Sequence, residues 1–173
     1  MKLSYSVAAI FLTLGRSVFA ADCVLNPLGD GQDDTSQILA AIDVCGTDGS
    51  ITLNEGDFNI TRKMTWNLTR STVDLYGTLN FAPDIDYWLQ ENSTYRVVFI
   101  QSQASWFVVT GRHFVIDAHN QGESPVTRPE GQDAEIDFCL GGINGNGQPW
   151  WEYFTTVPRQ DGDGRPLALW WFK

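Results

Sequence analysis

From Ser50 onward the sequence is a succession of short apolar runs rich in β-branched and aromatic residues, which predicts an all-β fold. Glycine, asparagine and aspartate residues separate the runs, as is typical of strands joined by tight turns. This pattern alone fits a sandwich, a barrel or a solenoid in which each coil stacks on the next. The predicted strands are 51–53, 58–60, 64–66, 72–76, 78–81, 96–100, 106–110 and 114–117.

One helix is predicted, ahead of the strands. Asp34 or Thr35 can cap its N-terminus, and Ile38, Leu39 and Ile42 follow at helical spacing. A solenoid needs a cap on its first coil, and an amphipathic helix at this position suits that purpose. No exact internal repeat is present, so periodicity does not choose the solenoid over the other two folds.

The first twenty residues are typical of a secretory signal peptide. Lys2 gives a positive start, residues 7–14 an apolar core, and residues 18–20 a cleavage site. The apolar run is too short to span a bilayer, so we expect no membrane anchor. Residues 1–20 are therefore expected to be removed from a secreted protein, leaving residues 21–173 as one domain or part of one.

Charge and sequons restrict the possible partners. The formal net charge is −10 at pH 7, which argues against nucleic acid because binding it needs a basic footprint. A uronate ligand would need local positive charge on this acidic background. Three N-glycosylation sequons fit secretion, at Asn59, Asn67 and Asn92.

The chain has three cysteines, an odd number for a secreted protein. We expect Cys23 and Cys45 to form a disulfide that fixes the N-terminus of the mature chain, because oxidising compartments favour such bridges. Cys139 is then left over. No spacing typical of metal ligands occurs, and we expect neither a metal nor a cofactor.

Residues 142–154 read Gly-Ile-Asn-Gly-Asn-Gly-Gln-Pro-Trp-Trp-Glu-Tyr-Phe. Gly142, Gly145 and Gly147 permit tight corners, because only glycine adopts positive φ without steric cost. The Trp150–Trp151 pair offers a flat apolar surface for core capping or sugar stacking. The run resembles the Gly-x-Ile-Asp/Asn-Gly-x-Gly-x-x-Trp-Trp signature of the family 28 glycoside hydrolases, the polygalacturonases that cut pectin.

Other segments extend the resemblance over nearly all of the mature chain. Residues 29–35 resemble the opening of many right-handed parallel β-helix proteins, and residues 59–68, 83–88 and 96–106 resemble the fungal exo-acting polygalacturonases. The resemblance implies a right-handed parallel β-helix with a short N-terminal capping helix. It also implies a pectin or galacturonan substrate for the full-length parent.

Inverting hydrolysis of a glycosidic bond needs two carboxyl groups roughly 6.5–9.5 Å apart. The family resembled supplies them from Asn-x-Asp and Asp-Asp motifs, followed by Gly-His-Gly and by an Arg-x-Lys that holds the uronate. All four lie after the Trp-Trp segment in that family, and none occurs in residues 157–173. We therefore assign no catalytic residue and expect an inactive N-terminal fragment, incomplete at its C-terminal end and poorly soluble because strand edges stay unpaired.

Several polar and aromatic residues could imitate a site, but each has a plainer interpretation. We expect helix capping for Asp33–Asp34, loop positions for Asp84 and Asp86, and a solvated turn for 161–164, which lacks the glutamate of a calcium loop. Structural roles are expected for the two histidines, and core packing is preferred to sugar stacking for the tryptophans. These residues are His113, His119, Trp66, Trp88, Trp106, Trp150 and Trp151.

Residues 123–141 interrupt the family pattern, which runs from 117–122 almost directly into 142–147. The segment is polar and contains two prolines. Our hypothesis is a retained intron, because Gln121 to Ser124 can be encoded with the splice donor GTGAGT and Leu140–Gly141 with the acceptor TAG. The alternative is a surface loop, which solenoids tolerate.

Two other functions stay open. A non-catalytic carbohydrate-binding β-domain would use exposed tryptophans and needs a closed fold. A β-helix lyase would need calcium-binding carboxylates and an arginine base, and the sequence shows no such cluster.

Overall fold

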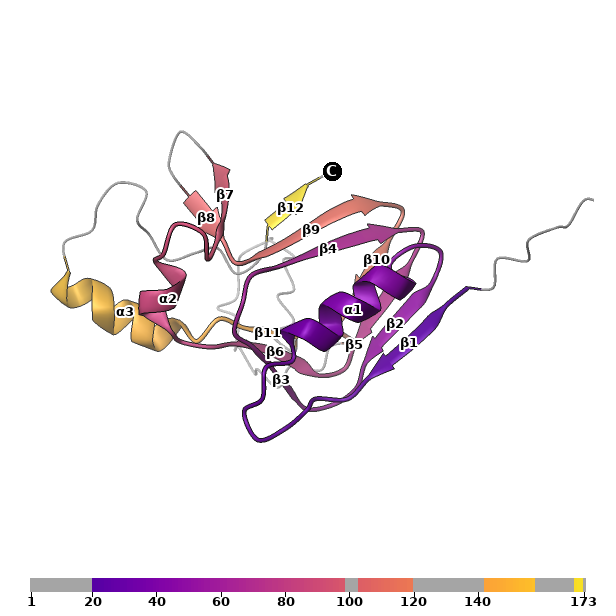
Figure 1. Ribbon diagram of the computed structural model, residues 1–173, viewed down its shortest axis with the longest axis horizontal. Helices are drawn as coiled ribbons and strands as arrows, with labels where there is room; N and C mark the ends of the chain where they lie inside the picture. Colours follow the sequence, from indigo (N-terminus) through magenta and orange to yellow (C-terminus); the bar gives the residue numbers. More distant parts are fainter. Residues whose placement is uncertain (1–19, 99–102, 120–141, 158–169, 173) are drawn as a thin grey trace, which may run out of the picture.

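Short strands dominate the part of the chain that the structure describes (Figure 1). The computed structural model describes residues 20–98, 103–119, 142–157 and 170–172. Its helices are α1 (Thr35–Cys45), α2 (Ile85–Trp88) and α3 (Gly147–Thr156). Its strands are β1 (Asp22–Leu25), β2 (Ser50–Leu53), β3 (Asp57–Ile60), β4 (Met64–Thr69), β5 (Thr72–Leu75), β6 (Thr78–Phe81), β7 (Tyr95–Val98), β8 (Gln103–Ser105), β9 (Phe107–Arg112), β10 (Val115–Asp117), β11 (Ile143–Asn144) and β12 (Trp170–Phe172).

Most of these strands lie in parallel sheets that the chain visits in the same order on each pass. The sheets have the strand orders β1-β2-β5-β10, β11-β6-β3 and β12-β9-β4. The chain therefore runs through β2, β3 and β4, then β5, β6 and β9, then β10, β11 and β12. This recurrence is consistent with a parallel β-helix and confirms the prediction of a mostly β fold. The hairpin of β7 and β8 is antiparallel.

Side chains in register on successive passes stack into ladders that fill the interior. Leu53 is the register partner of Leu25 on one side and Leu75 on the other. Ile51 and Val73 stack in the same way and are fully buried. Burying an aliphatic side chain of this size contributes about 1.5–3 kcal/mol. The alternation of buried and more exposed residues in β2, β3, β4, β5 and β6 thus fixes how one pass lies on the next.

Helix α1 packs against the first pass, as expected of a capping helix. Ile38, Ala41, Ile42 and Cys45 recur at helical spacing and are buried on one face. This face contacts β1, β2 and β4, and Figure 1 shows the helix lying alongside these strands.

The corner that precedes each of β2, β5 and β10 repeats one backbone conformation. Asp48, Arg70 and His113 each stand two residues before the strand, with φ of 56°, 48° and 55°. Residues other than glycine adopt this left-handed region rarely. The recurrence shows that the path of the chain requires it at this corner. The Asp48 carboxylate and the Arg70 guanidinium pair across two such corners.

The prediction of a single helix was wrong, since α2 and α3 are also present. The Asp84 carboxylate accepts a hydrogen bond from the backbone N–H of Tyr87 (3.0 Å) and so caps α2. In α3, Pro149 lies in the first turn, where its missing N–H costs nothing. We expected glycine to take the positive φ at the corner of this segment, and this was wrong, because Asn146 takes it instead (46°). Gly142 serves close packing instead, because a Cβ there would collide with the Leu75 side chain.

The atypical segment 123–141 falls in a connection that is otherwise short. Residues 54–56 join β2 to β3, and residues 76–77 join β5 to β6. The equivalent connection of the next pass, from β10 to β11, is residues 118–142. The segment itself, Cys139 and residues 161–164 lie outside the described residues.

Candidate functional site

Four side chains from two successive passes meet beside the β1-β2-β5-β10 sheet, outside the core of the protein: Asp74, Tyr76, Asp117 and His119. His119 Nε2 lies 2.9 Å from Asp74 Oδ1, and its Nδ1 lies 3.7 Å from Asp117 Oδ2. The imidazole ring stacks on Tyr76, with centroids 4.3 Å apart and an angle of 2° between the planes. The side chains of His119 and Asp74 are both largely buried, with 28% and 29% of their surface exposed.

Strand register builds this cluster. Asp74 and Asp117 are register partners on β5 and β10, and an aromatic ring follows each of them two residues later. Asp117 Oδ1 also accepts a hydrogen bond from the backbone N–H of His119 (2.8 Å), an Asx turn that supports the residue at φ 52°. Sequence reasoning missed Asp74, Tyr76 and Asp117. The shared Asp-x-aromatic spacing was the signal that could have found them.

The cluster is poorly suited to inverting hydrolysis. An inverting glycosidase leaves room for a water between its two carboxyl groups, which stand roughly 6.5–9.5 Å apart. Here the His119 ring faces both carboxylates with its nitrogens and takes up the place that the water would need. The geometry therefore describes a tie between two passes, and the structural role predicted for His119 agrees with it.

Asp33 and Asp34 lie at the start of α1, but they divide the predicted capping role unequally. Asp33 Oδ1 accepts a hydrogen bond from the backbone N–H of Thr35 (3.0 Å) and one from its hydroxyl. Asp34 is the N-cap residue of α1, one of the two positions predicted, but its side chain makes no cap hydrogen bond. Its fully buried carboxylate instead accepts from the backbone N–H of Leu28 (2.9 Å) and of Asn59 (2.8 Å). It thereby ties the loop before α1 to β3.

Two carboxyl groups have perturbed pKa values. Burial raises the pKa of Asp33, but hydrogen bonds from Thr35, Thr61 and Arg62 outweigh it and leave the pKa below its ordinary value. At the surface, the hydrogen bond from Arg70 lowers the pKa of Asp48 and raises that of Arg70 in turn. An ion pair with a nearby arginine contributes to both pKa shifts. Structural ion pairs cause such shifts outside active sites as well.

The remaining polar candidates are separate from one another. Asp84 caps α2, and Asp86 lies in that helix rather than in the predicted loop. His113 is exposed at the corner before β10. Among the residues that the structure describes, no group of three or more histidine, cysteine, aspartate or glutamate side chains could hold a metal ion.

Most of the tryptophans form the core. Trp66, Trp88, Trp106 and Trp150 are each 2% exposed or less, as the packing interpretation predicts. The Trp106 ring stacks on Phe81 (5.0 Å between centroids) and lies 5.8 Å from the Trp150 ring. Trp88 Nε1 donates a hydrogen bond to a backbone carbonyl, whereas the indole nitrogens of the other three have no hydrogen-bond partner among the residues that the structure describes. Trp151 differs, with 59% of its surface exposed.

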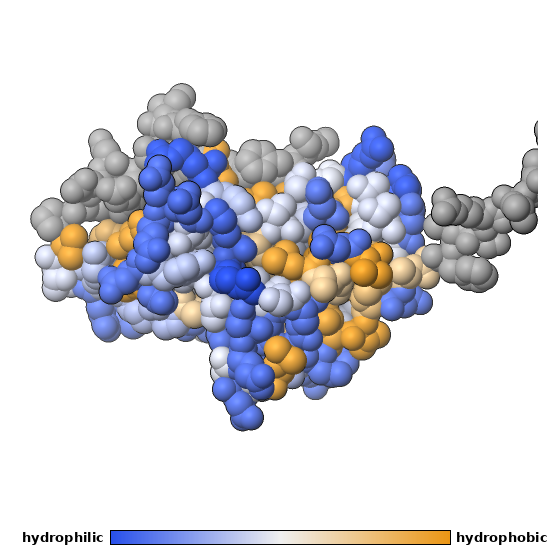
Figure 2. Space-filling model, viewed as in Figure 1, coloured by the Kyte–Doolittle hydropathy of each residue, from blue (hydrophilic) through white to orange (hydrophobic). Residues whose placement is uncertain are grey.

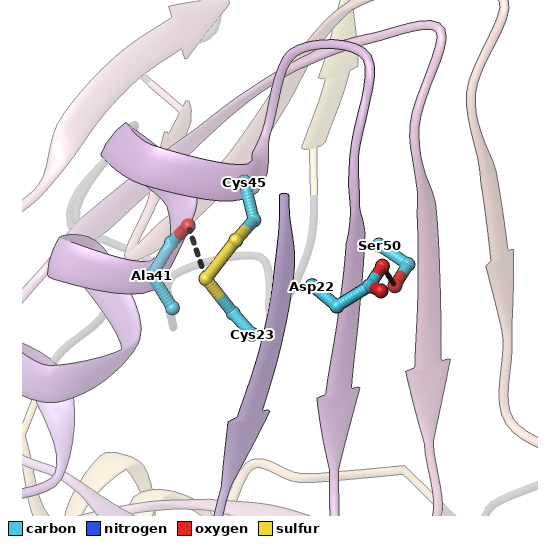
Figure 3. Close-up of a disulfide and its surroundings, with 5 residues drawn as sticks. All are labelled: Asp22, Cys23, Ala41, Cys45 and Ser50. Carbon is cyan, nitrogen blue, oxygen red and sulfur yellow. Dashed lines mark hydrogen bonds between the residues drawn. A yellow bond between two sulfur atoms is a disulfide. The ribbon is translucent and has the colours of Figure 1, made fainter. Parts of the chain in front are cut away.

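Cys23 and Cys45 are joined by a disulfide, with Cα atoms 6.1 Å apart (Figure 3). The bridge links β1 to the last residue of α1. The Sγ atom of Cys23 also lies 3.8 Å from the carbonyl oxygen of Ala41 in the same helix. Beside it, the Ser50 hydroxyl donates to Asp22 (2.6 Å), so both faces of β1 are held to the first pass.

The three predicted glycosylation residues lie in different surroundings. Asn59 is half-buried within β3, while Asn67 on β4 and Asn92 in the turn after α2 are exposed. Their modification is untested and stays a prediction.

The outer surface is largely hydrophilic on the face drawn in Figure 2. Apolar side chains gather over α1 and β1 on that face. Val44 on the helix and Val24 on the strand are 67% and 64% exposed. None of the described helices is long and apolar enough to cross a membrane.

Comparison with curated proteins identifies fungal relatives. A protein of Aspergillus niger named "Putative galacturan 1,4-alpha-galacturonidase A" is 37% identical over 150 residues, covering 85% of this chain and 29% of the relative. Its namesake from Aspergillus flavus is 35% identical over 180 residues, covering 98% of this chain and 36% of the relative. An exopolygalacturonase of Cochliobolus carbonum is 30% identical over 136 residues, covering 77% of this chain and 25% of the relative.

These matches confirm the resemblance to the polygalacturonase family and to its fungal exo-acting branch. The chain spans only 29% and 36% of the length of the first two relatives. No family model matches the chain, and no solved structure matches it.

Proposed function

We propose that this chain, a relative of the fungal exopolygalacturonases, forms the first coils of a secreted pectin-degrading glycoside hydrolase. The complete enzyme would release galacturonate from the ends of α-1,4-linked galacturonan with inversion, and its coils would wind into a right-handed parallel β-helix. The observation that carries the proposal is the 35% identity to a galacturonidase over 98% of this chain. The parallel passes and the capping helix support it as a scaffold of the expected kind.

The role proposed for these coils is structural. The carboxylates of Asp34, Asp48 and Asp74 tie parts of the fold together or form ion pairs, and none of the four catalytic motifs of the family occurs in residues 157–173. We therefore propose that the 173 residues alone do not hydrolyse pectin. No cofactor is needed for this chemistry, and the proposed partner is galacturonan.

Residues 123–141 are proposed to be retained intron sequence. Their place in the β10–β11 connection supports this, because the equivalent connections of the earlier passes are residues 54–56 and 76–77. Splicing between Gly122 and Gly142 would restore a short connection in frame.

A non-catalytic carbohydrate-binding domain is the weaker candidate. It would use exposed tryptophans, and the structure buries four of the five that the sequence offers for this purpose.

Transcript reads through the gene test the proposal, combined with expression of the two products. The expected reads lack the codons for residues 123–141 and continue into the four motifs. The longer product should release galacturonate from polygalacturonate, and the 173-residue chain should not. A transcript that retains residues 123–141 and ends after Lys173, or activity in the short chain, would contradict it.

A further inference from the structure

We propose that N-linked glycans occupy Asn67 and Asn92, while Asn59 stays unmodified and serves as a structural amide. The inference rests on the proposed function in one respect, because glycan transfer requires entry into the secretory pathway. All three residues satisfy the sequon, so sequence alone treats them as equal. Their surroundings in the fold are different.

The side-chain amide of Asn59 is already in use. Its Nδ2 donates a hydrogen bond to the backbone carbonyl of Gly31 (2.8 Å). The backbone N–H of Asn59 donates to the carboxylate of buried Asp34 (2.8 Å). In return, the backbone N–H of Asp34 donates to the backbone carbonyl of Asn59 (2.8 Å). Asn59 thus holds the loop before α1 with both its backbone and its side chain.

The neighbouring strands extend this arrangement into a ladder of amides. Asn80 on β6 is the register partner of Asn59 and of Asn144 on β11. Asn144 Nδ2 donates to Asn80 Oδ1 (2.9 Å), and Asn80 Nδ2 donates to Asp57 Oδ1 (2.8 Å). Asn59 is therefore flanked by the 28–34 loop on one side and by this ladder on the other. A glycan on its Nδ2 would have to emerge between them.

The other two acceptors face solvent. Asn67 is the exposed position in the alternating pattern of β4, on the side away from the core. Asn92 is exposed in the turn that follows α2, where the backbone N–H of Ser93 closes the turn on Gln90 (3.0 Å). A glycan is a bulky surface group, and both positions accept one without breaking a hydrogen bond that ties one pass to another.

The two classes differ because a sequon is modified only while its amide nitrogen is accessible. Asn59 is 28 residues from Gly31 and 25 residues from Asp34 along the chain, and all three precede the later passes. They can therefore come together as soon as the capping helix docks on β3.

The test is glycopeptide mass spectrometry of the full chain secreted from yeast through its own signal, with enzymatic glycan release in heavy water to mark occupied asparagines. We expect occupied Asn67 and Asn92 and unmodified Asn59. Matched variants remove each sequon without altering the asparagine. Thr69→Ala and Thr94→Ala should each lose one glycan in mass, whereas Thr61→Ala should lose none.

A second measurement tests the structural role. Asn59→Asp replaces a donor by a carboxylate that faces the Gly31 carbonyl, so its urea midpoint should fall, while that of Asn67→Asp should not. Occupancy at Asn59 equal to that at Asn67 would overturn the inference while leaving secretion intact. Secreted protein without any glycan would also overturn it, whereas failure of the chain to leave the cell would count against the proposed function as well.

Discussion

Replacing Asp34 by asparagine should destabilise the fold far more than the same change at an exposed aspartate. Asp34 is fully buried, and its two carboxylate oxygens face different donors. Oδ1 accepts from the backbone N–H of Leu28 and from Gln37, and Oδ2 accepts from the backbone N–H of Asn59. A carboxamide has only one oxygen, so one of these backbone donors must face an NH2 group.

The expected cost follows from that one unsatisfied contact. A hydrogen bond to a charged group contributes about 1.5–3 kcal/mol, and a buried donor left without a partner costs about 1–3 kcal/mol. These contributions overlap, so we expect Asp34→Asn to lower the free energy of unfolding by about 2–4 kcal/mol. Asp34→Ala should cost at least as much, because it removes the acceptors for both backbone donors.

Urea denaturation followed by tryptophan fluorescence measures the change, with Asp43→Asn as the matched control. Asp43 is exposed on α1, and a surface substitution of this kind usually stays within about 0.5 kcal/mol of wild type. A loss below 1 kcal/mol for Asp34→Asn, or an equal loss in the control, would refute the argument that this carboxylate ties the capping loop to β3.

Three other perturbations probe the same fold. Replacing Cys23 and Cys45 by serine should lower the free energy of unfolding by roughly 3 kcal/mol, because the bridge closes a loop with a sequence separation of 22 residues, and reduced wild type should match the variant in calorimetry. The pKa of Asp33 lies below its ordinary value of 3.8 in the folded protein, so its contribution to stability is complete above that pH and is lost as the pH falls below it. Asp33→Asn should therefore flatten the acid limb of a stability-against-pH curve, and an unchanged limb would contradict this. Gly111→Ala should lower the free energy of unfolding by more than about 2 kcal/mol, because φ is 129° and the new Cβ would collide with a backbone carbonyl. Gly147→Ala lies in open space at the start of α3, so it should leave the free energy of unfolding unchanged or raise it by up to about 1 kcal/mol. Paired urea midpoints measure both changes.

The strands of this fold could be predicted because their local pattern agrees with their burial. Most runs of the first two passes alternate between a buried apolar residue and a polar one, as in Ser50–Leu53 and Thr72–Leu75, whereas β9 begins with three buried apolar residues. The helix over 35–45 carries both a polar start and an apolar stripe. For these elements the spacing of apolar residues in the sequence therefore agrees with the positions that the fold buries.

The helix in the Trp-Trp segment could not be predicted in the same way. Glycine and proline at positions 147 and 149 argue locally against a helix, yet the burial of Trp150 beside Trp106 favours one. Tertiary packing decides this element, and a single sequence does not display it. The left-handed residue at the corner is likewise Asn146, although three glycines stand close by.

The polar cluster around His119 depends on register between distant strands. Asp74 and Asp117 become neighbours only when β10 stacks on β5, and the hairpin, α2 and β9 separate them in the chain. The Asp-x-aromatic spacing recurs in both strands, but by itself it does not show that the two strands are neighbours. The buried carboxylate of Asp34 depends on Leu28 and Asn59 for the same reason.

Product analysis on polygalacturonate shows whether the complete protein is an exo-acting polygalacturonase. The complete transcript product should be incubated with the polymer, and the earliest products separated by anion-exchange chromatography, with the 173-residue chain and a rhamnogalacturonan substrate in parallel. We expect free galacturonate as the first product of the longer protein and no product from the short chain. Two results would contradict an exo-acting polygalacturonase. In one, the longer protein releases no product from polygalacturonate, and in the other it releases oligomers before monomer.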